Sequence, residues 1–185
     1  IRNARGGENP SVSEAALKCQ EFGADGITIH PRPDQRHITS LDVTILKPIV
    51  YKEFNIEGYP SKDFINMVIS ISPTQVTLVP DKPEVLTSCA GWDTIKNKSF
   101  LKDVVLELKE HNIRTSIFVD PKEKMIEGAK KCETDRIELY TESFAKKYLI
   151  DRDKAIEPYI TAADKALELN LGINAGHDLN MNNLS

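Results

Sequence analysis

The chain has 185 residues, of which 40% are hydrophobic, and a formal net charge of −4. This length can bury one core, and the negative charge disfavours general binding to nucleic acid, so any anionic ligand has to meet a local cationic cluster. No apolar run reaches the roughly 20 residues of a membrane helix and no secretory signal is present, which favours a cytoplasmic protein without a membrane partner. The three cysteines lack metal or disulfide-framework spacing.

Short apolar strands alternate with amphipathic helices from the beginning of the chain. A capping pattern at 11–14 predicts the start of a helix that Gly23 ends, and the β-branched run 26–29 predicts a strand. The next predicted elements are a helix from 39–40 that Pro48 bends or shortens, a strand over 54–58, a helix from Ser61 and a strand over 75–80.

A long polar connection over 81–93 precedes the second half, and we expect it to act as a lid. The elements predicted beyond it are a helix over 99–111, a strand over 114–120, a helix over 122–132, a strand over 136–141, a helix over 153–170 and a strand over 172–176. No connection suits a hairpin, so the pattern indicates a parallel α/β fold, and a (β/α)8 TIM barrel is the leading architecture. A complete barrel takes about 250 residues. We therefore expect a single barrel domain over 1–185 that is incomplete at both ends.

Polar residues follow the predicted strands. His30 comes directly after the strand at 26–29, with Arg32 and His37 close behind it. Because ligands bind at the carboxyl ends of barrel strands, these groups indicate an anion site with acid–base chemistry. The alternative is a solvated, charged turn. Glu57 and Glu138 also lie at strand ends, where a carboxylate that pairs with a neighbouring cation is an equally simple interpretation.

Five segments together resemble one enzyme family. They are RNARG at 2–6, GADGITIHPRPDQRHI at 23–38, FNIEGYP at 54–60, VTLVPDKPE at 76–84 and INAGHDLN at 173–180. In these segments the chain is similar to the pyridoxine 5′-phosphate synthase family. The resemblance implies a (β/α)8 barrel that assembles as a homo-octamer, and a transferase of vitamin B6 biosynthesis. That enzyme would join 1-deoxy-D-xylulose 5-phosphate to 3-amino-2-oxopropyl phosphate and release inorganic phosphate and water, with no metal and no organic cofactor.

The resemblance also implies catalytic roles for four residues. His30 corresponds to a general base, and Glu57 to a second acid–base group. His177 corresponds to a proton donor, and Glu138 to a group that stabilises a transition state. Histidines that titrate near neutral pH suit a reaction that consists largely of proton transfers.

Five further positions correspond to substrate-binding residues of the family. Arg32, His37 and Thr87 would hold the deoxyxylulose phosphate, and Arg5 would bind the amino ketone phosphate. Asp178 stands where some family members have a ligand-binding glycine. The family's first strand and a late Gly-His strand end would lie beyond residues 1 and 185, so we expect the natural protein to extend past both.

Two alternatives stay open at this stage. One is another phosphosugar-handling barrel enzyme, of the aldolase or epimerase type. A Schiff-base aldolase needs a lysine at a strand end, and no predicted strand ends in one; a metal-dependent epimerase would bind a divalent ion through two histidines and two carboxylates. The second alternative is an inactive fragment that only binds phosphosugars.

Overall fold

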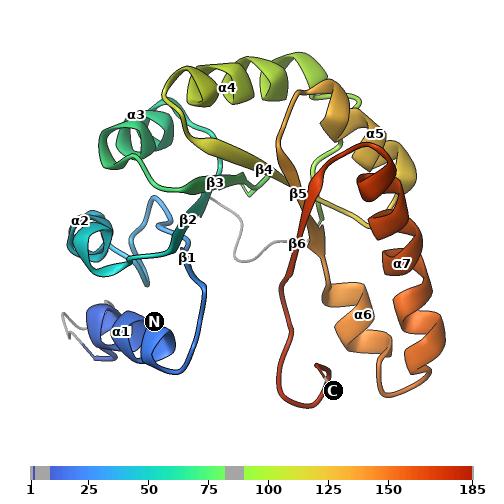
Figure 1. Ribbon diagram of the computed structural model, residues 1–185, viewed down its shortest axis with the longest axis horizontal. Coiled ribbons are helices and arrows are strands. Elements are labelled where there is room, and N and C mark those ends of the chain that lie inside the picture. The colour runs from blue at the N-terminus through green and yellow to red at the C-terminus, as the bar shows by residue number, and fades with distance from the viewer. Residues whose placement is uncertain (1, 3–8, 82–89, 185) are drawn as a thin grey trace. The chain divides into compact units, whose positions relative to one another are not determined.

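The structure is a computed structural model that describes residue 2 and residues 9–81 and 90–184. Contacts divide the chain into two compact units, one of Ile1–Thr87 with Leu108–Arg114 and one of Ser88–Glu107 with Thr115–Ser185. In both units, parallel strands alternate along the chain with helices (Figure 1).

The first unit contains three parallel strands, and β2 pairs with both of its neighbours. Its elements in chain order are α1 (Val12–Glu21), β1 (Gly26–Ile29), α2 (Ser40–Ile49), β2 (Glu53–Gly58), α3 (Lys62–Ile71) and β3 (Gln75–Leu78). Helix α2 lies beside both α1 and α3. The predicted order of helices and strands is confirmed in this half of the chain.

Local capping explains where the first helices begin. The Ser11 side chain accepts a hydrogen bond from the Glu14 backbone N–H, as the capping pattern predicted. At α2, Thr39 and Asp42 form a complete capping box. This helix ends one residue after Pro48, which agrees with the predicted shortening.

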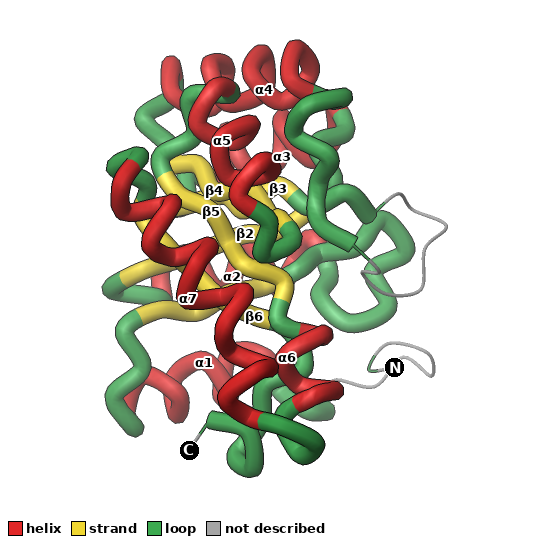
Figure 2. Tube along the Cα trace, turned by 90° about the vertical axis from the view of Figure 1, so that its right-hand side faces the viewer, coloured by secondary structure: helices red, strands yellow, loops and turns green. Residues whose placement is uncertain are grey.

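The second unit contains β4 (Arg114–Val119), whose first residue groups with the first unit, β5 (Arg136–Tyr140) and β6 (Gly172–Gly176), with β5 paired in parallel to both others. Its helices are α4 (Lys98–Glu110), whose last residues group with the first unit, α5 (Glu123–Lys131), α6 (Glu142–Lys147) and α7 (Arg152–Glu168). Helix α7 contacts both α5 and α6 (Figure 2). The sequence did not predict α6, because this six-residue helix buries none of its side chains and so shows no apolar periodicity.

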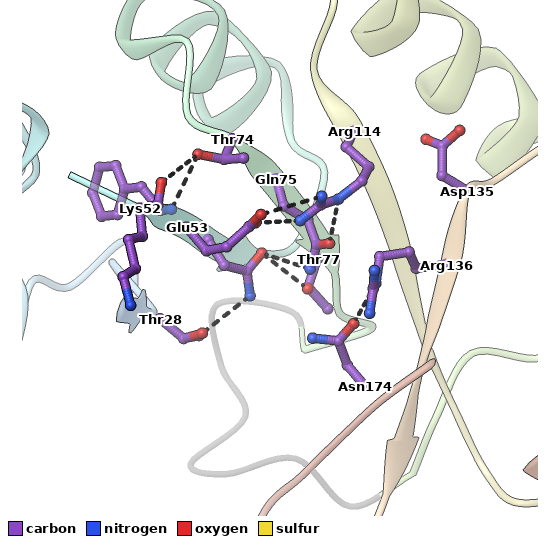
Figure 3. Close-up of polar contacts among 12 residues, drawn as sticks. Thr28, Lys52, Glu53, Thr74, Gln75, Thr77, Arg114, Asp135, Arg136 and Asn174 are labelled. Carbon is purple, nitrogen blue, oxygen red and sulfur yellow. Dashed lines mark hydrogen bonds and ion pairs between the residues drawn. The ribbon is translucent and has the colours of Figure 1, made fainter. Parts of the chain in front are cut away.

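Polar side chains connect neighbouring strands within each unit near their amino-terminal ends (Figure 3). In the first unit, Gln75 Nε2 donates to Asn55 Oδ1 at 3.3 Å, and Arg114 Nε donates to Gln75 Oε1 at 2.9 Å. In the second, Arg136 Nε donates to Asn174 Oδ1 at 2.7 Å. These bonds satisfy polar groups that the packing of the strands would otherwise leave buried and unpaired.

Apolar side chains of strands and helices form the core of each unit. Fully buried examples are Val43, Leu46 and Ile56 in the first unit and Ile117, Ile126 and Ile137 in the second. Parallel strands alternate with helices along the chain, which confirms the predicted α/β class. This order of elements, with six strands among the described residues, is the order found in an incomplete (β/α)8 barrel. Among the described residues, no helix is both long and apolar enough to span a membrane.

Candidate active site

His30 and Glu57 occupy neighbouring strand ends in the first unit. The register of β1 and β2 pairs Ile29 with Ile56, so the next residues along the two strands are His30 and Glu57. Glu57 is in turn paired in register with Thr77 of β3. Parallel strands thus bring the two predicted acid–base residues to the same edge of the sheet.

A cavity of about 390 Å³ opens beside His30 in the first unit. Its wall includes His30, Arg32, Tyr59, Asp63, Phe64 and Asp81. The structure therefore brings together the predicted base and one predicted phosphate ligand. Among the described residues, Glu57 and His37 do not line this cavity, and the His37 side chain is exposed.

Burial controls the charge of His30. The pKa of His30 is lowered from 6.5 to about 4: desolvation is the largest cause, the positive charge of Arg32 acts in the same direction, and the negative charge of Asp81 partly opposes both. At neutral pH the imidazole is consequently uncharged and has a nitrogen lone pair available. A neutral imidazole at the wall of a cavity can accept a proton from a ligand, which is what a general base must do.

The lowered pKa of His30 predicts a pH dependence of stability. The unfolded chain, where histidine titrates near 6.5, binds more protons than the folded chain between about pH 6.5 and pH 4. The stabilising contribution of His30 to the free energy of unfolding is therefore fully present above pH 6.5. It is lost as the pH falls to about 4, and the total loss of stability is about 3 kcal/mol. Urea unfolding from pH 7 to 4 measures it as the difference between the wild type and His30→Gln. Parallel pH profiles of the two proteins would contradict the prediction.

Arg32 is held inside the cavity wall by a carboxylate that the sequence analysis did not identify. Its side chain is 10% exposed, and Nη1 lies 3.9 Å from Oδ2 of Asp81, whose side chain is 4% exposed. The guanidinium can present two parallel N–H groups to a phosphate, which a lysine cannot do. Asp81 directly follows the predicted strand over 75–80 and is the first residue of the predicted lid over 81–93, but it was given no role of its own.

Arg2 forms hydrogen bonds both to the loop that carries Arg32 and His37 and to α2. Arg2 Nη1 donates to Oδ2 of Asp42 at 2.7 Å and to the backbone oxygen of His37 at 2.9 Å. Asp42 also accepts a hydrogen bond from the backbone N–H of Thr39, the residue that caps α2. Arg2 thus links the loop directly to the beginning of the helix.

In the second unit, Glu138 lies beside the end of β6. Its side chain is mostly buried, at 8% exposure, and a Cβ atom added to Gly176 would lie only 2.8 Å from its Oε1. The absence of a side chain at Gly176 therefore provides the space that the carboxylate occupies. His177 follows Gly176 directly, and its ring meets Tyr140 edge-on at 5.0 Å.

Asp178 contacts the imidazole of His177. Its Oδ2 lies 2.7 Å from His177 Nδ1. The backbone φ angle is 98° at His177 and 58° at Asp178. Positive φ is uncommon for residues other than glycine, and such strain clusters at functional sites. A carboxylate at Nδ1 favours the tautomer with hydrogen on that nitrogen and leaves Nε2 available to a ligand. The contact with substrate predicted for Asp178 stays a prediction.

Two predicted site residues, Arg5 and Thr87, lie outside the described residues, as do residues 82–89 of the predicted lid. The end of that connection is described in the second unit. The Gly91 N–H donates to Asp120 Oδ1 at 3.0 Å, and a Cβ at Gly91 would lie 2.3 Å from the Asp120 nitrogen. Only glycine fits this close approach to the end of β4. Within the described part of the chain, no group of three or more His, Cys, Asp or Glu residues could hold a metal ion.

Comparison with known proteins identifies the family. The family model for "Pyridoxal phosphate biosynthesis protein PdxJ" matches residues 1–185. This chain belongs to the PdxJ family. Three similar relatives are each named pyridoxine 5′-phosphate synthase, and all three match 100% of this chain and 78% of their own length. They come from Flavobacterium johnsoniae (57% identical), Christiangramia forsetii (55%) and Bacteroides fragilis (54%). The predicted resemblance is therefore confirmed.

Solved structures with low sequence identity share the fold of this PdxJ-family chain. An alanine racemase from Clostridium difficile, in complex with cycloserine, has a TM-score of 0.52 at 12% identity and covers 89% of this chain and 43% of its own. A D-psicose 3-epimerase solved in the presence of D-fructose has a TM-score of 0.51 at 11% identity, with coverage of 88% and 78%. These similarities support the barrel architecture alone.

Proposed function

We propose that this chain carries out the pyridoxine 5′-phosphate synthase reaction. The reaction joins 1-deoxy-D-xylulose 5-phosphate to 3-amino-2-oxopropyl phosphate and releases inorganic phosphate and water. The observation that carries this proposal is the whole-chain match to synthases that are 54–57% identical. The acid–base groups and the buried arginine of the first unit agree with it, because they suit a sequence of proton transfers on a phosphorylated substrate.

His30 serves as the general base in this proposal. Imine formation, phosphate elimination and ring closure each require that protons leave carbon, nitrogen or oxygen atoms of the substrates. His30 is uncharged at neutral pH and lies at the cavity wall, which supports its role in accepting such protons. Glu57, at the neighbouring strand end, is the second group that exchanges protons during the same sequence.

Arg32 binds the phosphate of the deoxyxylulose substrate, and the partial burial of its side chain strengthens this charge-assisted contact. His37 and Thr87 complete that phosphate site, and Arg5 binds the amino ketone phosphate. In the second unit, His177 is the proton donor. Because Asp178 holds hydrogen on Nδ1, Nε2 first takes up a proton, and the resulting imidazolium then donates that proton to the substrate. Glu138 stabilises a transition state from its place beside Gly176.

The family assignment also favours finer statements about assembly and location. We propose a single barrel domain that assembles as a homo-octamer and works in the cytoplasm on phosphorylated small molecules. An aldolase or epimerase activity has weaker support, because the similarity to the epimerase structure lies at 11% identity and concerns the fold alone.

Direct product formation tests the proposed reaction. The full natural polypeptide that carries this sequence, incubated with both phosphorylated substrates, should yield pyridoxine 5′-phosphate, detected by mass, together with inorganic phosphate. Reactions that lack either substrate serve as controls. Folded protein that binds the deoxyxylulose phosphate but forms no product would contradict the proposal and favour a binding-only barrel.

A further inference from the structure

Asp81 is a buried carboxylate for which the proposed mechanism has no role. It lies three residues after β3, in the wall of the cavity that contains His30. The Val79 N–H donates to the Gly58 backbone oxygen at 3.0 Å, which extends the pairing of β2 and β3 past the end of β3. Pro80 follows with its fixed φ angle. The backbone that carries Asp81 is therefore well anchored to the sheet.

The Asp81 carboxylate interacts with two side chains of the cavity wall, Arg32 and His30. Its Oδ2 lies 3.9 Å from Arg32 Nη1, which is beyond hydrogen-bond distance but within the range of a strong charge interaction at these low exposures. It also raises the pKa of His30, whereas burial and Arg32 lower it. Besides His30, the titratable or charged side chains around this cavity in the described part of the chain are Arg32 from the loop after β1, Tyr59 from the loop after β2, Asp63 of α3 and Asp81 itself.

We propose that Asp81 is a positioning residue of the synthase reaction, which holds the Arg32 guanidinium at the cavity wall and stabilises the positive charge that His30 gains when it accepts a proton. This inference rests on the proposed function. A buried guanidinium needs a carboxylate or a similar partner, because removal from water is costly for an isolated charge. Since the ion pair is loose, Asp81 restrains Arg32 through charge and does not form a direct hydrogen bond with Nη1 at this distance.

Protonation of His30 places a second positive charge near Arg32. Without Asp81, burial and the Arg32 charge would both oppose this step and no carboxylate at this position would offset them. Asp81 thus supports substrate binding through Arg32 and proton uptake through His30. The pKa of His30 distinguishes this role from a purely structural one, because local unfolding would hydrate the imidazole and raise that pKa, whereas loss of the Asp81 charge alone lowers it.

The test compares Asp81→Asn with Asp63→Asn, which removes the same charge from an exposed residue of the same cavity wall. Asp81→Asn should raise KM for 1-deoxy-D-xylulose 5-phosphate about tenfold, lower kcat about tenfold and lower the pKa of His30 by about one unit. NMR titration of the His30 ring protons measures that pKa without any turnover. Asp63→Asn should change all three quantities much less.

Several outcomes would overturn the proposal. An unchanged pKa of His30 and unchanged KM in Asp81→Asn would exclude the role, and equal effects of Asp63→Asn would assign them to the total charge of the cavity. If Asp81→Asn does not fold, the double variant Arg32→Gln/Asp81→Asn replaces it and is compared with the single variant Arg32→Gln. The pKa of His30 should still be lower in the double variant, but the KM of the two variants should be equal. A higher KM in the double variant would contradict positioning through Arg32. Because the NMR measurement needs no product, failure of the proposed reaction is distinguishable from failure of this inference.

Discussion

Replacement of His30 by alanine should lower kcat by about 100- to 10,000-fold, the range expected for the loss of a general base. His30 is uncharged at neutral pH because burial and the charge of Arg32 lower its pKa to about 4, and it lies at the wall of the cavity that contains Arg32. Alanine removes the proton acceptor but leaves the guanidinium in place. KM for the deoxyxylulose phosphate should therefore change much less than kcat.

The matched control is His111→Ala, which makes the same substitution at an exposed histidine directly after α4. Steady-state kinetics with both substrates should show wild-type kcat for this control, and thermal melts should confirm that both variants are folded. A His30→Ala protein with normal kcat and a raised KM would show that His30 binds substrate and does not act as the base.

Replacement of Arg32 by alanine should raise KM for 1-deoxy-D-xylulose 5-phosphate by about 100-fold, because the substrate phosphate loses a charge-assisted partner inside a desolvated site. The exposure of only 10% for this side chain makes the contact stronger than one made at the surface. Arg32→Lys should recover only part of the loss, since an ammonium group cannot form two parallel bonds to a phosphate.

Arg36→Ala is the control for this experiment. Arg36 lies four residues further along the same loop, and its Nε donates to Asp34 Oδ2 at 2.6 Å. Its removal should leave KM close to the wild-type value. Melting temperatures must accompany the kinetics, because Arg32→Ala leaves Asp81 buried without this ion-pair partner and should destabilise the first unit. A fall in kcat at constant KM would show that Arg32 acts in the chemical steps.

The sequence by itself determined the type and order of the main elements. The β-branched run at 26–29 predicted β1, and the apolar spacing in 153–170 predicted α7. Both predictions were possible because hydrophobic periodicity depends only on residues that are close together in the sequence. It also determined that His30 follows a strand end, and the motifs around His30 and His177 indicated the family. The short helix α6 was not predicted, since it buries no side chain and leaves no such periodicity.

Only the tertiary structure decided how these residues behave chemically. The lowered pKa of His30 arises from burial and from charges on Arg32 and Asp81, and Asp81 is distant in the sequence from His30. The space that Glu138 occupies depends on the missing side chain of Gly176 on the neighbouring strand. A local pattern contains no information about desolvation or about contacts between strands. Electrostatic energies depend on both, so the ionisation and orientation of the site were set only when the strands packed together.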